Sequence, residues 1–235
     1  MELKLLLLYS MLYLLASYLI AVLIQQYPLP ILGSIHFVQD VWYSLVFKVL
    51  LLAVIPFIVY FRYWRYTLED LLLGVRSSIR MIAAAIFLVL VGFLLNAGHL
   101  GPIQRGIGHL NDKALRLALG ICMPLVVAAI PEEFFFRGVL QTRLERKCSR
   151  VTAVVVSSLF FTAWHLPSRY LLSSGVEGKA GDFGDVLLHT GVPVFIAGVF
   201  FGLHWSRYRN IIVLVLTHWA VDILPSVSSY LKIRF

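Results

Sequence analysis

Seven long apolar runs, separated by short polar segments, restrict the fold of this chain more than any other feature. A helix needs roughly 20 mostly apolar residues to cross a bilayer. The chain is 60% hydrophobic and 14% charged, whereas soluble domains average about 45–50% apolar and about 25% charged residues. The sequence therefore predicts an all-α protein, a polytopic transmembrane helical bundle of about seven to eight spans. The runs are Leu5–Ile24, Trp42–Phe61, Met81–Asn96, Leu117–Leu140, Val151–Leu166, Val186–Trp205 and Ile211–Leu224.

The net charge of +8 comes mainly from short loops, where Lys and Arg act as orientation signals and not as a nucleic-acid surface. One set of alternating loops holds 12 of the 20 Lys and Arg residues, the other holds seven, and Lys48 lies within a span. Because the richer side is normally cytoplasmic, we expect a cytoplasmic N-terminus and, with seven spans, an external C-terminus. A missed or re-entrant span would reverse the side of the C-terminus. We expect an integral protein of the bacterial inner (plasma) membrane, with the lipid bilayer as a partner. The richer set is Lys4, Arg62, Arg65, Arg76, Arg80, Arg137, Arg143, Arg146, Lys147, Arg150, Arg207 and Arg209.

Two adjacent carboxylates inside the fourth run, Glu132 and Glu133, are the first candidates for chemistry. Ionisable groups at membrane depth are costly and usually mark functional sites. Glu133 and Arg137 are four residues apart, so they can pair on one face of a helix. Glu132 then lies about 100° around the helix, without a counter-ion of its own, and suits a general base. The structural alternative is a buried salt bridge with a spare glutamate.

Two histidines in other runs are the next candidates. His165 lies near the end of the fifth run, four residues after Phe161, and a lone histidine at a helix end is more often structural or interfacial than catalytic. His218 and Asp222 lie four residues apart in the last run and therefore share a helix face. A local hydrogen bond between His218 and Asp222 is the structural alternative there.

Two helical hairpins bring these groups to similar depths. The fourth and fifth runs turn near residues 146–150, and positions 132 and 165 lie equally far from that turn. The sixth and seventh runs turn near residues 207–210, on the same side of the bilayer. At about 1.5 Å of rise per residue, Glu132, His165, His218 and Asp222 can converge within the bundle. One site explains this convergence better than three unrelated structural features. In the sixth run, Gly198 and Gly202 form a small-xxx-small pattern that predicts close helix packing.

In order and spacing, these residues resemble the three motifs of the CAAX-protease and bacteriocin-processing family, the CPBP or Abi group of intramembrane endopeptidases. The resemblance covers residues 117–224. It implies N-terminal transmembrane helices over residues 1–110 and a catalytic helical core over residues 111–235. The first motif is Glu132, Glu133 and Arg137; the second is Phe161 and His165; the third is His218 and Asp222.

The resemblance also implies hydrolysis of a peptide bond by a water molecule that a glutamate activates. Glu132 would be the general base, and His165 would help to position the water. His218 and Asp222 would stabilise the oxyanion or hold the geometry of the site. Supporting roles would fall to Glu133, Arg137 and Phe161.

A metal ion is the open alternative to this chemistry. Glu132, His165 and His218 are also plausible zinc ligands, with water in the fourth position. The sequence has no His-Glu-x-x-His helix, so we expect no cofactor, although a divalent metal such as zinc stays open. No Ser or Cys occurs in an activated pattern beside a base.

The sequence thus predicts an intramembrane endopeptidase that acts on a membrane-associated peptide or protein tail. Prenylated C-terminal tails, bacteriocin-like leaders and membrane-anchored sorting tags are candidate substrates, and we favour the last two for a chain this short. A proton-coupled membrane transporter with Glu132, His165 and His218 as a relay is one alternative, against which the lack of an internal repeat counts. The other is a non-catalytic immunity or partner protein of the same fold, which the filled motif positions do not support.

Overall fold

The computed structural model describes residues 2–26, 47–67, 69, 78–107, 113–172 and 178–232. In these ranges all the regular elements are helices, which confirms the predicted all-α bundle. With η for π- and 3₁₀-helical segments, they are α1 (Glu2–Gln26), η3 (Leu50–Val54), α3 (Ile55–Ile58), η4 (Val59–Tyr63), α4 (Ile79–Leu95), η6 (Ala97–His99), α5 (Leu100–Ile107), α6 (Lys113–Pro124), η7 (Leu125–Ala129), α7 (Ile130–Glu132), η8 (Glu133–Gln141), α8 (Thr142–Glu145), α9 (Arg150–Leu172), α10 (Phe183–Val186), η9 (Leu187–Gly191), α11 (Val192–Tyr208) and α12 (Ile211–Lys232).

Each of the seven predicted spans coincides with a helix. Five helices in the described ranges are long and apolar enough to cross a membrane. They become six if α4 and the helical residues 97–107, which are bent by 51° at their junction, form one broken span. The helix Leu50–Tyr63 is apolar but shorter, and the predicted start of this span at Trp42 lies outside the described residues. Because a bent pair can also be a re-entrant loop, the side of the C-terminus stays a prediction. The five helices long and apolar enough to cross a membrane are Glu2–Gln26, Ala114–Glu145, Arg150–Leu172, Phe183–Tyr208 and Ile211–Leu231.

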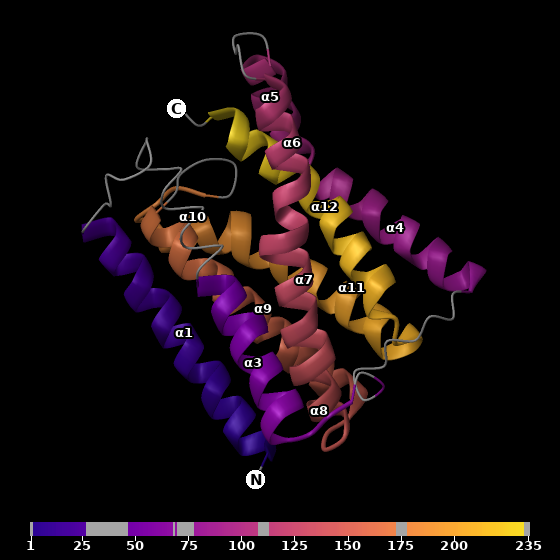
Figure 1. Ribbon diagram of the computed structural model, residues 1–235. Coiled ribbons are helices and arrows are strands. Elements are labelled where there is room, and N and C mark those ends of the chain that lie inside the picture. Colours follow the sequence, from indigo (N-terminus) through magenta and orange to yellow (C-terminus); the bar gives the residue numbers. More distant parts are fainter. Residues whose placement is uncertain are drawn as a thin grey trace.

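The long helix from α6 to α8 runs through the middle of the bundle (Figure 1). Around it, α1 packs on α9, α9 packs on α11, and α12 packs on both α4 and α6. The short helix that begins with η3 packs against α7. The central helix therefore contacts both the N-terminal and the C-terminal helices at the depth of α7, where Glu132 lies.

Aromatic side chains fix the central helix on the side of α1 and α9. Phe135 and Phe136 are fully buried. The ring of Tyr13 meets that of Phe135 edge-on at 5.3 Å, and Phe136 meets Phe161 at 5.2 Å. Edge-to-face pairs at these centroid distances are favourable beyond the apolar area that they bury. They hold η8, and with it Glu133 and Arg137, against two neighbouring helices.

The fourth span is longer than the predicted end at Leu140, because polar side chains beyond it are buried. Gln141 donates from Nε2 to the carbonyl of Gly202 at 2.8 Å and to Ser206 Oγ at 2.9 Å. Arg143 Nε lies 2.9 Å from Glu2 Oε1, and this ion pair joins the start of α1 to α8. Buried polar groups with such partners do not end a helix in the way that solvated groups do.

Gly198 and Gly202 allow α11 to lie close to its neighbours, as the small-xxx-small pattern predicts. A Cβ atom on Gly202 would lie 2.9 Å from Gln141 Oε1 and 3.0 Å from Val154 Cγ1, and one on Gly198 would lie 3.1 Å from Ser158 Cβ. Since side chains are missing at these two positions, polar groups of η8 reach the backbone carbonyls of α11.

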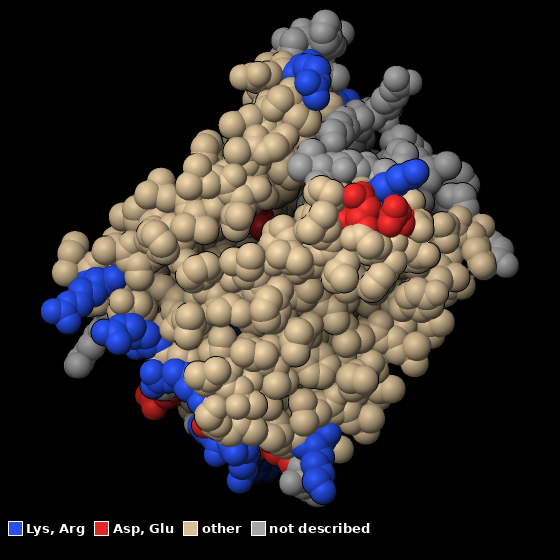
Figure 2. All heavy atoms as spheres, turned by 180° about the vertical axis from the view of Figure 1, so that it is seen from behind, with Lys and Arg blue, Asp and Glu red and all other residues tan. Residues whose placement is uncertain are grey.

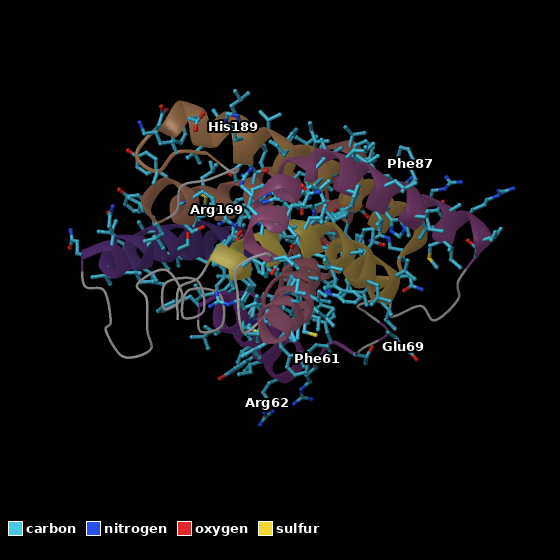
Figure 3. The ribbon with its side chains drawn as sticks, turned by 90° about the horizontal axis from the view of Figure 1, so that it is seen from above. Phe61, Arg62, Glu69, Phe87, Arg169 and His189 are labelled. Carbon is cyan, nitrogen blue, oxygen red and sulfur yellow. The ribbon has the colours of Figure 1, made fainter. Side chains whose placement is uncertain are left out.

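The outside of the bundle is apolar over most of its height. Large apolar side chains are exposed along α1 and α4, including Leu8, Leu12 and Phe87. Lys and Arg side chains gather at the end where the N-terminus lies (Figure 2), and Arg62 and Glu69 extend outward from the helices (Figure 3). An apolar belt with charges at its edge identifies an integral membrane protein.

Candidate active site

The carboxylate of Glu132 lies at the centre of the candidate site and is fully buried. Its Oε2 atom is 3.8 Å from Nε2 of His165 and 3.8 Å from Nε2 of His218. Its Oε1 atom forms an ion pair with Nζ of Lys48. The structure thus brings together residues from α7, α9, α12 and the helical turn before η3, which lie far apart in the sequence.

His165 is oriented by its own helix. Its Nδ1 atom is 2.8 Å from the carbonyl oxygen of Phe161, one turn earlier in α9. A carbonyl can only accept, so Nδ1 carries a proton, and in the neutral ring Nε2 carries the lone pair. That lone pair faces Glu132, where it can accept a hydrogen bond from a molecule held between the two side chains.

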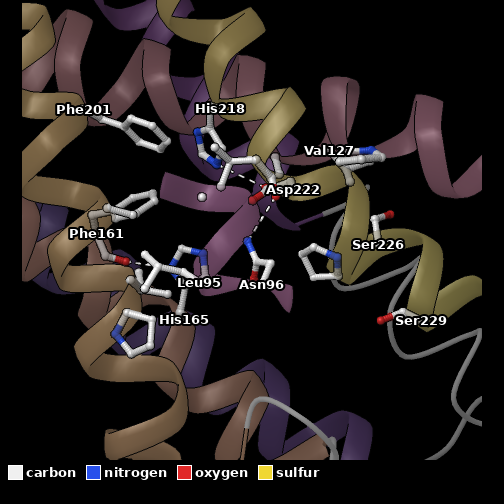
Figure 4. A pocket seen from close by; sticks show the side chains of 18 of the residues that line it. Leu95, Asn96, Val127, Phe161, His165, Phe201, His218, Asp222, Ser226 and Ser229 are labelled. Carbon is white, nitrogen blue, oxygen red and sulfur yellow. Dashed lines mark hydrogen bonds and ion pairs between the residues drawn. The ribbon is translucent and has the colours of Figure 1, made fainter. Parts of the chain in front are cut away.

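His218 is held from both sides. Its Nδ1 atom donates to Glu133 Oε1 at 2.7 Å, and its Nε2 atom is 3.2 Å from Asp222 Oδ2 (Figure 4). His218 is buried, whereas the side chain of Asp222 is 31% exposed. The His218–Asp222 contact that the sequence suggests is therefore one part of a longer chain of contacts that also includes Glu133.

The predicted pair of Glu133 and Arg137 is confirmed. Arg137 Nη1 lies 3.1 Å from Glu133 Oε1, and Nη2 donates to the carbonyl of Gly198 at 3.2 Å. The guanidinium carbon of Arg137 lies 4.3 Å from the centre of the Phe161 ring. The same ring meets the imidazole of His165 at 4.8 Å and that of His218 at 5.9 Å. Phe161 thus fills the space between the two histidines and packs against the supporting ion pair.

A cavity of about 240 Å³ opens beside these groups. His165, His218, Asp222 and Asn96 line it (Figure 4). Lys48 lines it as well. The rest of the wall is largely apolar and comes from α4, α6, α11 and α12. A mostly apolar pocket with a few convergent polar groups is the usual form of a substrate site. Other lining residues include Leu88, Val91, Leu95, Val127, Phe200 and Phe201.

Lys48 is the site residue whose place the sequence did not reveal. The expectation that Glu132 has no counter-ion is wrong, because Lys48 supplies one from another helix. Its occurrence within an apolar run was the available signal, since charges at membrane depth rarely lack a function. The sequence alone could not say which carboxylate it would meet.

The side chains around Glu132 decide whether a metal ion fits this site. In the described ranges, no group of three or more His, Cys, Asp and Glu side chains is arranged to hold a metal ion. One oxygen of Glu132 is paired with Lys48, and each ring nitrogen of His218 faces a carboxylate. The proposed zinc ligands Glu132, His165 and His218 thus lie together in an arrangement that does not fit a metal.

Fold and site together define a polytopic helical membrane protein with two buried carboxylates and two histidines beside an apolar cavity. Over residues 114–224 the chain matches the model of a protein family described as type II CAAX prenyl endopeptidase Rce1-like. This match confirms, for this segment, the resemblance that the three motifs suggest. No curated protein and no solved structure matches the chain.

Proposed function

We propose that this protein is an intramembrane endopeptidase in which Glu132 activates a water molecule for hydrolysis of a peptide bond. One observation carries the proposal: a fully buried carboxylate has one oxygen 3.8 Å from two histidine nitrogens, next to an apolar cavity. A separation of 3.8 Å is too long for a direct hydrogen bond. A water molecule that contacts both the carboxylate and the imidazoles would bridge them, and in this proposal that water is the nucleophile.

In the first step, the water oxygen attacks the carbonyl carbon of the scissile bond. One water proton passes to Glu132 Oε2, and the electron pair of the C=O bond moves to the carbonyl oxygen. His165 holds the water by accepting its second hydrogen at Nε2, which the bond from Nδ1 to Phe161 keeps directed at Glu132. General-base catalysis of this kind needs the base within hydrogen-bond reach of the proton that it removes.

The negative charge on the carbonyl oxygen is stabilised from the His218 side of the site. Glu133 and Asp222 each accept a hydrogen bond from the ring, so a doubly protonated His218 is a fixed positive charge that does not have to reorganise as the negative charge develops. Such preorganised electrostatic stabilisation in a water-poor site is worth about 3–4 kcal/mol. In the second step the electron pair on the oxyanion re-forms the C=O bond, the C–N bond breaks with its electrons passing to nitrogen, and Glu132 returns the proton to the leaving amine.

The substrate class follows from the walls of the cavity and from its place in the bundle. Apolar side chains from α4, α6, α11 and α12 favour an apolar segment of a membrane-associated peptide or protein tail. We propose that the lipid bilayer delivers this substrate laterally, because the helices around the cavity are themselves exposed to the apolar belt. Bacteriocin-like leaders and membrane-anchored sorting tags have this character, as do prenylated tails.

The orientation proposed from the loop charges is a cytoplasmic N-terminus in a bacterial inner membrane. The Lys and Arg side chains that gather at the end of the molecule that carries the N-terminus support this orientation (Figure 2), and Lys4, Arg62, Arg146 and Lys147 are exposed. Reporter fusions at the N-terminus test it: a reporter active only outside the cytoplasm should stay inactive.

The decisive experiment is cleavage of a library of membrane-anchored peptides by the purified protein in nanodiscs, with products identified by mass spectrometry. Glu132→Gln should abolish cleavage while the protein stays folded. Glu69→Gln, the same change at an exposed position, is the matched control and should cleave normally. If a chelator abolishes cleavage and zinc restores it, the protein is a metalloprotease, and catalysis by Glu132 without a metal is contradicted.

The transporter alternative is tested on the same samples. If the wild type cleaves no peptide of the library, proton flux is measured in proteoliposomes. A flux that Glu132→Gln abolishes would favour a proton-coupled transporter and contradict the peptidase proposal.

A further inference from the structure

Lys48 belongs to none of the three motifs, and it lies outside the segment that matches the family model. It precedes η3 in a helix that packs against α7. Its Nζ atom forms an ion pair with Glu132 Oε1, and its side chain is 13% exposed and lines the cavity. The N-terminal half of the chain therefore contributes a charged group to the centre of the site.

The burial of Glu132 requires a cation. A carboxylate without contact with solvent is costly unless it is paired. The guanidinium of Arg137 binds Glu133 and the carbonyl of Gly198, so it is not the counter-ion of Glu132. In the described part of the chain, Glu132 forms ion pairs with Lys48, His165 and His218, and Lys48 is the one ammonium among them.

The ion pair also makes the two oxygens of Glu132 unequal. Lys48 holds Oε1, so Oε2 is the oxygen that faces both histidines. The terminal torsion of a glutamate has a broad minimum, so the carboxylate plane is not set by its own rotamer. Without Lys48, nothing else in these contacts distinguishes one oxygen from the other or fixes the plane.

We propose that Lys48 is a positioning residue for the hydrolysis: it anchors Oε1 of Glu132 so that Oε2 alone meets the attacking water. This inference rests on the function proposed above. Lys48 acts through Glu132, so its loss slows the chemical step and leaves substrate binding largely intact. A misplacement of about 1 Å in a catalytic group can cost about 100-fold in rate, which sets the expected fall in kcat for Lys48→Met.

The test compares four variants in the nanodisc cleavage assay. Lys48→Met should lower kcat about 100-fold with little change in KM. Lys48→Arg, which keeps a cation, should recover most of the activity, and Lys48→Gln, which keeps a donor without the charge, should fall between the two. Arg62→Met removes an exposed cation at the other end of the same helix and should behave like the wild type. A raised KM with unchanged kcat, or no rescue by Lys48→Arg, would overturn the positioning role.

A second measurement follows thermal unfolding and does not depend on cleavage. Lys48→Met should lower the Tm of the wild type more than it lowers the Tm of Glu132→Gln, because only the wild type keeps a buried charge without its partner. Equal losses in both backgrounds would contradict the pairing itself. If Glu132→Gln is inactive and Lys48→Met is fully active, the Lys48 proposal fails and the proposed function stands. If the wild type cleaves nothing, the proposed function fails, and the unfolding comparison still decides whether the pair exists.

Discussion

Replacement of Arg137 by Met tests the supporting layer of the site separately from its chemistry. The guanidinium bonds Glu133 Oε1 at 3.1 Å and the carbonyl of Gly198 at 3.2 Å, in a fully buried position. The loss of one partner from a buried ion pair costs about 3–5 kcal/mol. Because Glu133 keeps His218 Nδ1 at 2.7 Å, we expect the lower end, about 3 kcal/mol.

For a chain of this size, about 3 kcal/mol corresponds to a fall in Tm of roughly 6–12 °C. Thermal unfolding in detergent, followed by circular dichroism, measures it. Arg146→Met, at an exposed position that ends the same helix, is the matched control and should unfold like the wild type. Glu132→Gln should abolish cleavage but lower Tm less than Arg137→Met does, because Lys48, which loses its partner, is 13% exposed and keeps contact with solvent.

A double-mutant cycle between Glu133→Gln and Arg137→Met sharpens this prediction. The double variant should lose less free energy of unfolding than the sum of the two single losses, by about 0.5–3 kcal/mol, because it leaves no uncompensated charge. Additive losses, or a Tm of Arg137→Met equal to that of Arg146→Met, would refute the reasoning. Equal unfolding of Glu132→Gln, Glu133→Gln and Arg137→Met would remove the division between a catalytic and a supporting layer.

Three further changes test the packing around the site. Gly202→Val should lower the free energy of unfolding by about 1–3 kcal/mol, because its Cβ atom would lie 2.9 Å from Gln141 Oε1. Gly184→Val, whose Cβ atom would lie at an ordinary contact distance of 3.5 Å from Asp182 Oδ1, is its control in the same unfolding assay. Glu2→Gln should expose α1 to proteolysis, since it weakens the ion pair with Arg143, and an unchanged proteolysis rate would argue against this anchor. Phe161→Leu should lower kcat in the cleavage assay with only a small fall in Tm, because the ring separates the two histidines. A large fall in Tm with an unchanged kcat would make Phe161 merely structural.

The helices could be predicted from the sequence, since each predicted run contains enough apolar residues to require a helix in a bilayer. The convergence of Glu132, His165 and His218 could also be predicted, because two hairpins and a constant rise fix their relative depth. The pair of Glu133 and Arg137 needed only the four-residue spacing within one helix.

The features that the sequence did not predict depend on contacts between helices that are distant in the sequence. Lys48 meets Glu132 because η3 packs against α7, and no periodicity encodes that neighbour. The fourth helix continues past Leu140 because Gln141 finds the carbonyl of Gly202 on α11. The π-helical turns from Glu133 to Gln141 likewise leave no simple signature in composition, although such turns are frequent at functional sites.

During synthesis of the chain, α12 is the helix that completes the site. His218, Asp222 and one wall of the cavity come from this helix, which is synthesised after the others described here. Until it inserts, Glu133 lacks the imidazole of His218, and the cavity lacks the wall that α12 supplies. On the proposed mechanism, a half-made protein beside the insertion machinery is therefore unable to cleave the other nascent chains around it, and hydrolysis begins only when the last wall is in place.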